Sequence, residues 1–308
     1  MSSLKVRLFG KFSVEREAKE LKKLDACKEQ ELFCYLLIYR NRPHPRENLA
    51  SLLWGNCTTS KSKKYLRQTI WHIQKSLETN IGSNVQSVFH VEHDWVQLKL
   101  DSEIELDVAD FEQAFATVEG IPGAELNEEN FCGLQDAVSL YKGDLLEGWY
   151  QDWCIFERER LQNIYLTMLG KIMGYCKRHR LYDKGRVYGS LILRYDRASE
   201  RTHRLLMQMQ YLSGDRTAAL RQYDLCASAL EEELSVKPGK LTRAVYERIC
   251  ADQIEDFELN SFEENTTPPS ELLDRLKRLQ TFLSEAERRI RHEIKAVEMD
   301  LKAYKAQD

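Results

Sequence analysis

The sequence predicts a mostly α-helical protein with a small α+β region at its N-terminus. Short alternating apolar patterns occur only near the start of the chain, whereas residues 107–255 show long helical patterns with few glycines or prolines. The charge divides in the same place: residues 1–100 hold 17 Lys and Arg against 10 Asp and Glu, a net charge of +7, within a chain of net charge −4. We call residues 1–100 the head and the rest of the chain the body. A basic head beside an acidic body indicates two regions with different partners.

The composition is that of an ordinary folded protein. A chain of 308 residues with 43% hydrophobic and 31% charged residues is long enough for two or three domains. No apolar run reaches the roughly 18 residues that cross a membrane, and the N-terminus lacks the apolar core of a secretory signal. We therefore expect a cytoplasmic protein with no membrane contact. The cysteines, none in a CxxC pair, are expected to be reduced core thiols rather than zinc ligands or disulfides: residues 27, 34, 57, 132, 154, 176, 226 and 250.

The first 100 residues predict a winged helix-turn-helix. Alternation on both sides of Gly10 predicts a strand pair, and the alternation of residues 88–100, with a turn near Glu92, His93 and Asp94, predicts a hairpin. Helical spacing predicts three helices between them, over residues 28–39, up to Trp54, and over residues 61–78. In the order strands, three helices, hairpin, the third helix would enter the major groove and the hairpin would lie beside it as a wing.

The helix predicted over residues 61–78 has two opposite faces. An apolar stripe predicts the buried side: Leu66, Ile70, Ile73 and Leu77. The opposite side has cations, an amide and an aromatic ring, and no acid: Lys61, Lys64, Gln68, Trp71 and Lys75. A Lys-rich face is often only solvated, but the net charge of +7 of this region favours a helix that lies on nucleic acid.

The second half predicts a stacked array of antiparallel helices. An offset near 34 residues places Ile172 over Leu206 and Gly185 over Ala219, as expected for a degenerate tetratricopeptide-like repeat. The predicted helices cover residues 107–119, 127–141, 152–178, 183–195, 199–212, 216–234 and 240–254.

An acidic, polar stretch ending in Pro268 and Pro269 predicts a linker, after which a final helix carries a heptad seam from Leu272 to Leu301. Such a helix either pairs with a copy of itself, which we favour, or folds back on the array. The predicted domains are a winged helix-turn-helix (1–102), a tetratricopeptide-like array (103–256), a linker (257–269) and a coiled-coil-like oligomerisation helix (270–305).

Several motifs resemble one known family. In the head they are VRLFGKFSV, ENLASLLWG and YLRQTIWHIQKSL, and in the body ELDVADFEQA, LYKGDLLEGWYQDWCIFERERL and HRLLMQMQYLSGDRTAALRQYDLCASALEEEL followed by Pro238. Over about residues 4–250 the chain resembles bacterial transcriptional activators of the antibiotic-regulatory type, in which an OmpR-like winged helix-turn-helix precedes a bacterial transcriptional activator domain. Two positions depart from the family pattern: Asp196-Arg197 replaces an Asp-Pro, and Ser235 stands where Gly is common.

The resemblance implies a transcription factor that binds direct repeats of double-stranded DNA as a dimer or tandem pair and recruits RNA polymerase. The DNA-binding role then falls on the third helix, with His93 of the wing as a further candidate for a phosphate contact. Lysines would pair with phosphates, Gln68 would read an adenine edge and Arg67 a guanine or phosphate. We expect Tyr65 to pack within the domain and leave open whether the wing covers Trp71. The candidates are Lys61, Lys64, Arg67, Gln68, Trp71, His72, Lys75 and His93.

Nothing in the sequence predicts an enzyme, a cofactor or a metal site. The histidines are isolated, and the acids Glu157 and Glu159 lie on a charged helix where Arg160 provides an ion-pair partner. The alternative function is a helical-repeat interaction scaffold whose basic head binds protein or RNA rather than promoter DNA. The operator, the target genes, the effector and the direction of regulation are not readable from the sequence.

Overall fold

The computed structural model describes residues 4–16, 19–20, 27–81, 89–98 and 104–252. The chain divides into two compact units, residues 1–246 and residues 247–308. The predicted linker (257–269) and terminal helix (270–305) lie outside the described residues, so the heptad seam and the domain bounds stay predictions.

The predicted strand pair and hairpin are present, and each belongs to a larger sheet. Strands β1 (Leu4–Arg7) and β2 (Ser13–Arg16) are antiparallel, and the sheet continues with β3 (Lys19–Glu20) on one side and β7 (Ile104–Leu106) on the other. Strand β7 pairs parallel with β1, which places the start of the helical body in the sheet of the head. The hairpin of β5 (Phe89–Val91) and β6 (Trp95–Leu98) gains β4 (His44–Pro45) beside β6.

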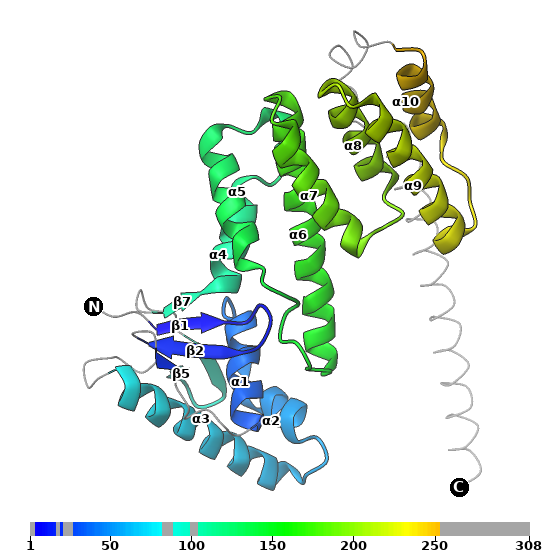
Figure 1. The fold of residues 1–308 in the computed structure, drawn as a ribbon. Helices are drawn as coiled ribbons and strands as arrows, with labels where there is room; N and C mark the ends of the chain where they lie inside the picture. Colours follow the sequence, from blue (N-terminus) through cyan, green and yellow to red (C-terminus); the bar gives the residue numbers. More distant parts are fainter. Residues whose placement is uncertain (1–3, 17–18, 21–26, 82–88, 99–103, 253–308) are drawn as a thin grey trace, which may run out of the picture. The chain divides into compact units, whose positions relative to one another are not determined.

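Three helices lie in the chain between the strand pair of β1 and β2 and the hairpin of β5 and β6, as predicted (Figure 1). They are α1 (Cys27–Ile38), α2 (Arg46–Trp54) and α3 (Thr59–Ile81). Each of the three contacts the other two, and their apolar side chains form one core with the sheet residues Val6 and Val96. The head is therefore a winged helix-turn-helix in which α3 is the third helix.

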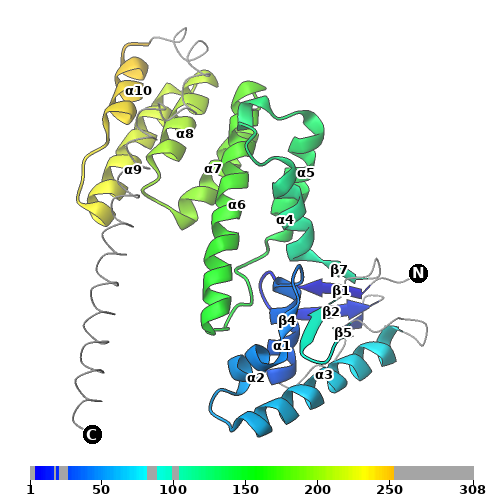
Figure 2. The same cartoon turned by 180° about the vertical axis from the view of Figure 1, so that it is seen from behind.

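The body is an array of helices, and neighbours in the chain pack side by side from α6 to α9 (Figures 1 and 2). The predicted repeat positions Ile172, Leu206, Gly185 and Ala219 are all buried. The mostly helical fold with a small α+β head is thus confirmed. The elements of the body are α4 (Asp107–Thr117), η1 (Gly123–Glu125), α5 (Glu128–Leu140), α6 (Asp152–Arg178), α7 (Tyr182–Tyr195), α8 (Glu200–Leu212), α9 (Arg216–Leu234) and α10 (Lys240–Cys250).

The approach of η1 to α6 requires glycine at position 123. A Cβ atom on Gly123 would lie 2.3 Å from the carbonyl oxygen of Lys171, and neither backbone can yield easily. We expect Gly123→Ala to lower the free energy of unfolding by about 1–3 kcal/mol, the usual cost of overpacking. Gly133→Ala is the matched control, because Gly133 is exposed in α5 with no neighbouring atom near its Cβ position. The control should gain up to about 1 kcal/mol of helix propensity. Urea unfolding measures the free energy of unfolding of both variants. Equal values for Gly123→Ala and Gly133→Ala would contradict the close approach of η1 to α6.

Ser235, one of the two departures from the family pattern, has a left-handed backbone. It follows α9 with φ 53° and ψ 38°, and its N–H donates to the carbonyl oxygen of Glu231. Glycine adopts this conformation without the steric cost that a Cβ atom adds. We expect Ser235→Gly to raise the free energy of unfolding by about 1 kcal/mol. Ser228→Gly, at an exposed position inside the same helix, should lower the free energy of unfolding. If both variants were less stable than wild type, the left-handed backbone at position 235 would not favour glycine.

Candidate nucleic-acid interface

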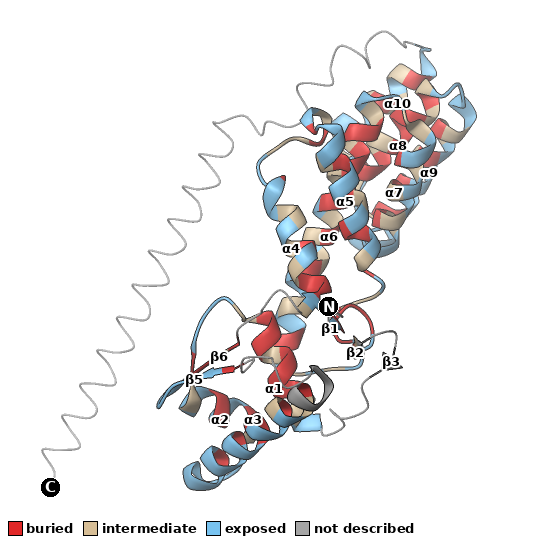
Figure 3. Ribbon diagram, turned by 90° about the vertical axis from the view of Figure 1, so that its left-hand side faces the viewer, coloured by how far each residue is buried: buried red, intermediate tan, exposed pale blue. Residues whose placement is uncertain are grey.

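Helix α3 divides into the two faces that the sequence predicts. Leu66, Ile70, Ile73 and Leu77 are each at most 4% exposed and pack in the core of the head. Figure 3 shows both exposed and buried residues along α3. The seven candidates on the other side of the helix are all exposed: Lys61, Lys64, Arg67, Gln68, Trp71, His72 and Lys75. We call these seven residues the α3 face. It combines amine and guanidinium donors with one amide, which are the groups that bind phosphates and base edges.

Packing against α1 and α2 holds α3 in place. Besides the apolar stripe, Ser62 and Thr69 are buried, and the hydroxyl of Ser62 donates to the carbonyl oxygens of Thr58 and Thr59. The amine of Lys63 donates to Glu47 of α2 over 2.5 Å, which ties the two helices together at the surface. Lys63 therefore has a carboxylate partner on α2.

Trp71 is 53% exposed, so the wing does not cover it. The amine of Lys75 lies over the indole ring at 4.8 Å from its centre, a cation–π contact that groups these two side chains on the surface. The Nδ1 of His72 lies 4.0 Å from a carboxylate oxygen of Glu29 on α1. Tyr65, expected to pack within the domain, is partly exposed and has its ring 6.1 Å from that of Trp54.

The structure adds donors that the sequence analysis did not name. Thr59 and Ser60 are exposed in the first turn of α3, where backbone N–H groups and the helix dipole favour an anion. The first turn has no acidic residue. Hydroxyls at this position are common phosphate donors. The run of Thr and Ser before Lys61 is the signal that would have identified them.

The wing is less cationic than its two histidines suggest. His93 is almost fully exposed, but its Nδ1 lies 2.9 Å from the carboxylate of Asp94. His90 is in turn 3.0 Å from the carboxylate of Glu92. The acids therefore compete with a phosphate for both imidazoles, and a contact of His93 with DNA stays a prediction. Trp95, which begins β6, exposes an aromatic surface on the same hairpin.

The motifs that carried the family resemblance meet where the head joins the body. The turn between β1 and β2 pairs with the loop after α5: Gly10 donates to Asp144, Leu146 donates to Leu8, and Glu147 donates to Gly10, all through backbone groups at 2.8–2.9 Å. Arg158 of α6 supports this loop. Its guanidinium donates to the carbonyl oxygens of Leu145, Leu146 and Trp149. The residues LFG of the head and GDLLEG of the body thus form one main-chain junction.

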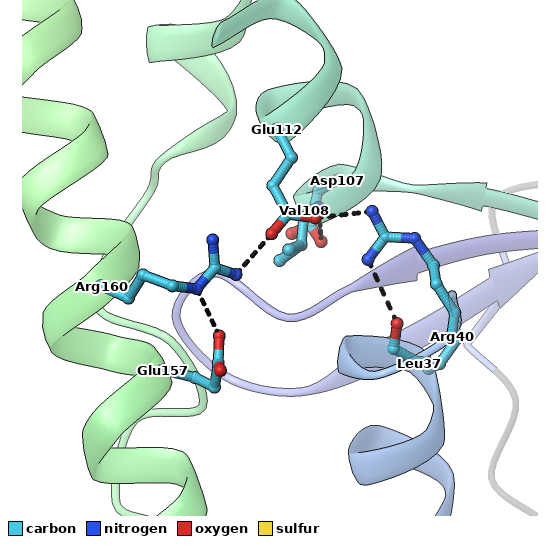
Figure 4. A network of polar contacts seen from close by, with 7 residues as sticks. All are labelled: Leu37, Arg40, Asp107, Val108, Glu112, Glu157 and Arg160. Atoms are coloured by element: carbon cyan, nitrogen blue, oxygen red, sulfur yellow. Dashed lines mark hydrogen bonds and ion pairs between the residues drawn. The ribbon is translucent and has the colours of Figure 1, made fainter. Parts of the chain in front are cut away.

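A charged network crosses the same junction (Figure 4). Arg40, two residues after the end of α1, donates to Glu112 of α4 over 2.6 Å, Glu112 also accepts from Arg160 of α6, and Arg160 donates to Glu157 over 2.7 Å. The side chain of Arg40 is only 10% exposed, so part of the network is shielded from water. The expected surface pair of Glu157 and Arg160 is therefore the outer end of a link between the head and the body.

The described residues contain no group of three or more His, Cys, Asp or Glu that could hold a metal ion. His203 is buried, with its ring nitrogens close to Gln222 and to the carbonyl oxygen of Arg197, so it serves the packing of α8 against α9. Within the described part of the chain, none of the helices is both long and apolar enough to pass through a bilayer.

Comparison with known proteins identifies the body. Residues 106–250 match the family model of the bacterial transcriptional activator domain. The solved structure of Mycobacterium tuberculosis EmbR in complex with a low-affinity phosphopeptide is similar in fold, with a TM-score of 0.63 and 18% sequence identity over 85% of this chain and 69% of that one. No curated protein matches the sequence.

Proposed function

Because the chain belongs to the family of proteins that carry a bacterial transcriptional activator domain, we propose that it is a sequence-specific DNA-binding regulator that activates transcription by recruiting RNA polymerase. The observation that carries the proposal is the α3 face: a helix of the winged helix-turn-helix with every predicted contact residue exposed and its apolar side buried. In this proposal α3 enters the major groove and the body transmits activation.

Roles on the α3 face follow from chemistry. Lys61, Lys64 and Lys75 pair with phosphates and set the affinity and its salt dependence. Gln68 presents an amide that pairs with an adenine edge, and Arg67 binds a guanine or a phosphate. Trp71 is free of the wing and packs on sugar or a thymine methyl. His72 and His93, each beside a carboxylate, contribute less.

Two further parts of the proposal concern assembly and location. Direct repeats in the promoter would be occupied by two copies, paired through the helix predicted over residues 270–305, in the bacterial cytoplasm. Sedimentation of the full chain beside a chain truncated after Asn265 tests the pairing: the full chain should sediment as a dimer and the truncated chain as a monomer. Equal association states would remove this helix from the assembly.

The test of the DNA-binding proposal is selection of duplex DNA followed by gel-shift titration. We expect a preferred sequence, an affinity that falls steeply with salt, and loss of binding in Lys64→Glu combined with Gln68→Ala. Binding to RNA or to a protein partner that survives this double substitution, with no affinity for duplex DNA, would favour the helical-repeat scaffold instead.

A further inference from the structure

A buried histidine joins the wing, which is the hairpin of β5 and β6, to the end of α1. His44 lies in β4, which pairs with β6 beside the hairpin. The residue is 4% exposed, and its Nε2 lies 3.0 Å from the carbonyl oxygen of Tyr39, the residue after α1. A carbonyl oxygen only accepts, so this nitrogen carries the N–H of the neutral ring. Two residues further on, the backbone N–H of Arg46 donates to the carbonyl oxygen of Asp94 in the wing over 2.9 Å. His44 thus lies where the wing is attached to the helices of the head.

Two tyrosine rings lie against the imidazole, and α6 of the body contacts both of them. The ring of Tyr35 is centred 5.4 Å from that of His44, and the ring of Tyr39 is centred 6.3 Å away, both edge-to-face. Tyr35 also lies edge-to-face with Trp153 of α6, at 5.4 Å between the ring centres. The hydroxyl of Tyr39 donates to the carboxylate of Glu157 on the same helix. Because the tyrosines are held in this way, we expect the imidazole to reach water only if β4 moves away from them.

Burial and charge both oppose a proton on His44. Burial lowers the pKa of the imidazole from its ordinary value of 6.5, and the guanidinium of Arg42 lowers the pKa further. The carbonyl oxygen of Tyr39 favours the charged ring without reversing this shift. The two tyrosines and Val96 of β6 also face the ring, and Glu157 accepts from the hydroxyl of Tyr39. Below about pH 6.5, protons therefore favour a state in which the imidazole meets water.

We propose that His44 is a positioning residue, which holds the wing in place while its ring is neutral and releases the wing when the ring takes up a proton. Release separates β4 from the tyrosines and exposes the imidazole. The released state binds more protons, so each fall of one pH unit below about 6.5 favours release by up to about tenfold. In the proposed function the wing lies beside α3 on DNA, so its release should weaken binding to the duplex. This last step alone rests on the proposed function, because the attachment of the wing can be measured without DNA.

Hydrogen exchange of the Arg46 amide in the full chain, without DNA, measures release of the wing. Between pH 7.5 and 5.5 the protection factor of this amide, which corrects for the intrinsic effect of pH on exchange, should fall several-fold in wild type, and at most about tenfold. In His44→Gln it should not depend on pH, because glutamine has an N–H donor for the carbonyl oxygen of Tyr39 and takes up no proton.

His203→Gln is the matched control. His203 is also buried, its Nε2 lies 2.9 Å from the carbonyl oxygen of Arg197, and burial also lowers its pKa, but it lies in α8 of the body. The Arg46 amide of this variant should show the same fall in protection as wild type. The protection at pH 7.5 reports how well a variant side chain fits, whereas its dependence on pH reports the titration of His44.

Titration of a duplex selected by the wild-type protein, over the same pH range, tests the effect on binding. The affinity of wild type divided by that of His44→Gln should fall with the pH, and this ratio cancels the charges of His72 and His93, which both proteins share. If the Arg46 amide behaves as expected but no duplex is bound, the role of His44 stands and the DNA-binding proposal falls. Equal pH dependence of this amide in wild type and His44→Gln would overturn the inference. A constant affinity ratio in proteins that bind the duplex would overturn its effect on DNA binding.

Discussion

Replacing Lys61, Lys64 and Lys75 together by Gln is expected to weaken binding to the selected duplex about 100-fold near physiological salt. Each phosphate contact that is lost removes one released counterion, so the slope of log affinity against log salt should fall by about 2.7. All three lysines are exposed on α3 and none contributes to the apolar stripe, so stability should change little. Fluorescence titrations at several salt concentrations give affinity and slope in one series.

Comparing single variants separates affinity from sequence reading. Lys64→Gln should weaken binding to every sequence equally and lower the slope by about 1, whereas Gln68→Ala should cost about 1–3 kcal/mol on the preferred site and little on other sites. Lys184→Gln, on exposed Lys184 of α7, is the matched charge control. A slope that stays constant in the triple variant, or that falls equally in the Lys184 control, would mean that the α3 face does not lie on DNA.

The sequence was most informative where one helix carries both its packing and its function. Apolar residues of α3 repeat at the helical period. This spacing predicts both the buried stripe of Leu66, Ile70, Ile73 and Leu77 and the exposed residues on the opposite side. The apolar spacing did not predict that Ser62 and Thr69 are buried. The hydroxyl of Ser62 donates to carbonyl oxygens of the preceding turn, and a hydroxyl paired in this way can enter a helix interface without an apolar signal.

The short strands and the junction were not predictable from local patterns. Strand β7 has three residues and pairs with a strand about 100 positions earlier in the chain, so its register depends on the finished fold. The same holds for Arg158, because its guanidinium donates to the backbone carbonyl oxygens of a loop whose course depends on the finished fold. The carboxylates of the wing are readable in the sequence, but their pairing with His90 and His93 depends on the shape of the hairpin.

Asp107 contributes to the junction between head and body through a buried carboxylate. It begins α4, is 9% exposed, and its carboxylate accepts from the backbone N–H groups of Leu8, Phe9 and Val108 at 2.8–3.0 Å. Leu8 and Phe9 lead directly into the turn that bonds to the loop after α5. Burial raises the pKa of Asp107 to about 6, even though the three donors favour the ionised form.

The variant Asp107→Asn is expected to lower the free energy of unfolding by about 2–4 kcal/mol at neutral pH, because an amide has one acceptor oxygen and turns its own N–H groups toward buried donors. Asp110→Asn, in the same turn but exposed, should cost less than about 0.5 kcal/mol. Hydrogen exchange should show faster exchange of the Leu8, Phe9 and Leu146 amides in Asp107→Asn only. Full protection of these amides in the variant would show that the carboxylate does not hold the junction.

The raised pKa of Asp107 also determines how the difference in the free energy of unfolding between wild type and Asp107→Asn depends on pH. Below about pH 6 the folded protein takes up a proton on Asp107, while the same carboxyl in the unfolded chain stays ionised until about pH 4. The folded state is therefore favoured by protonation, and wild type should gain stability relative to Asp107→Asn as the pH falls from 6 to 4. Urea unfolding of both proteins across this range measures the difference. If the difference in the free energy of unfolding between wild type and Asp107→Asn instead became smaller as the pH falls, the three N–H donors would outweigh burial. The carboxylate would then join the head to the body in its ionised form between pH 6 and pH 4.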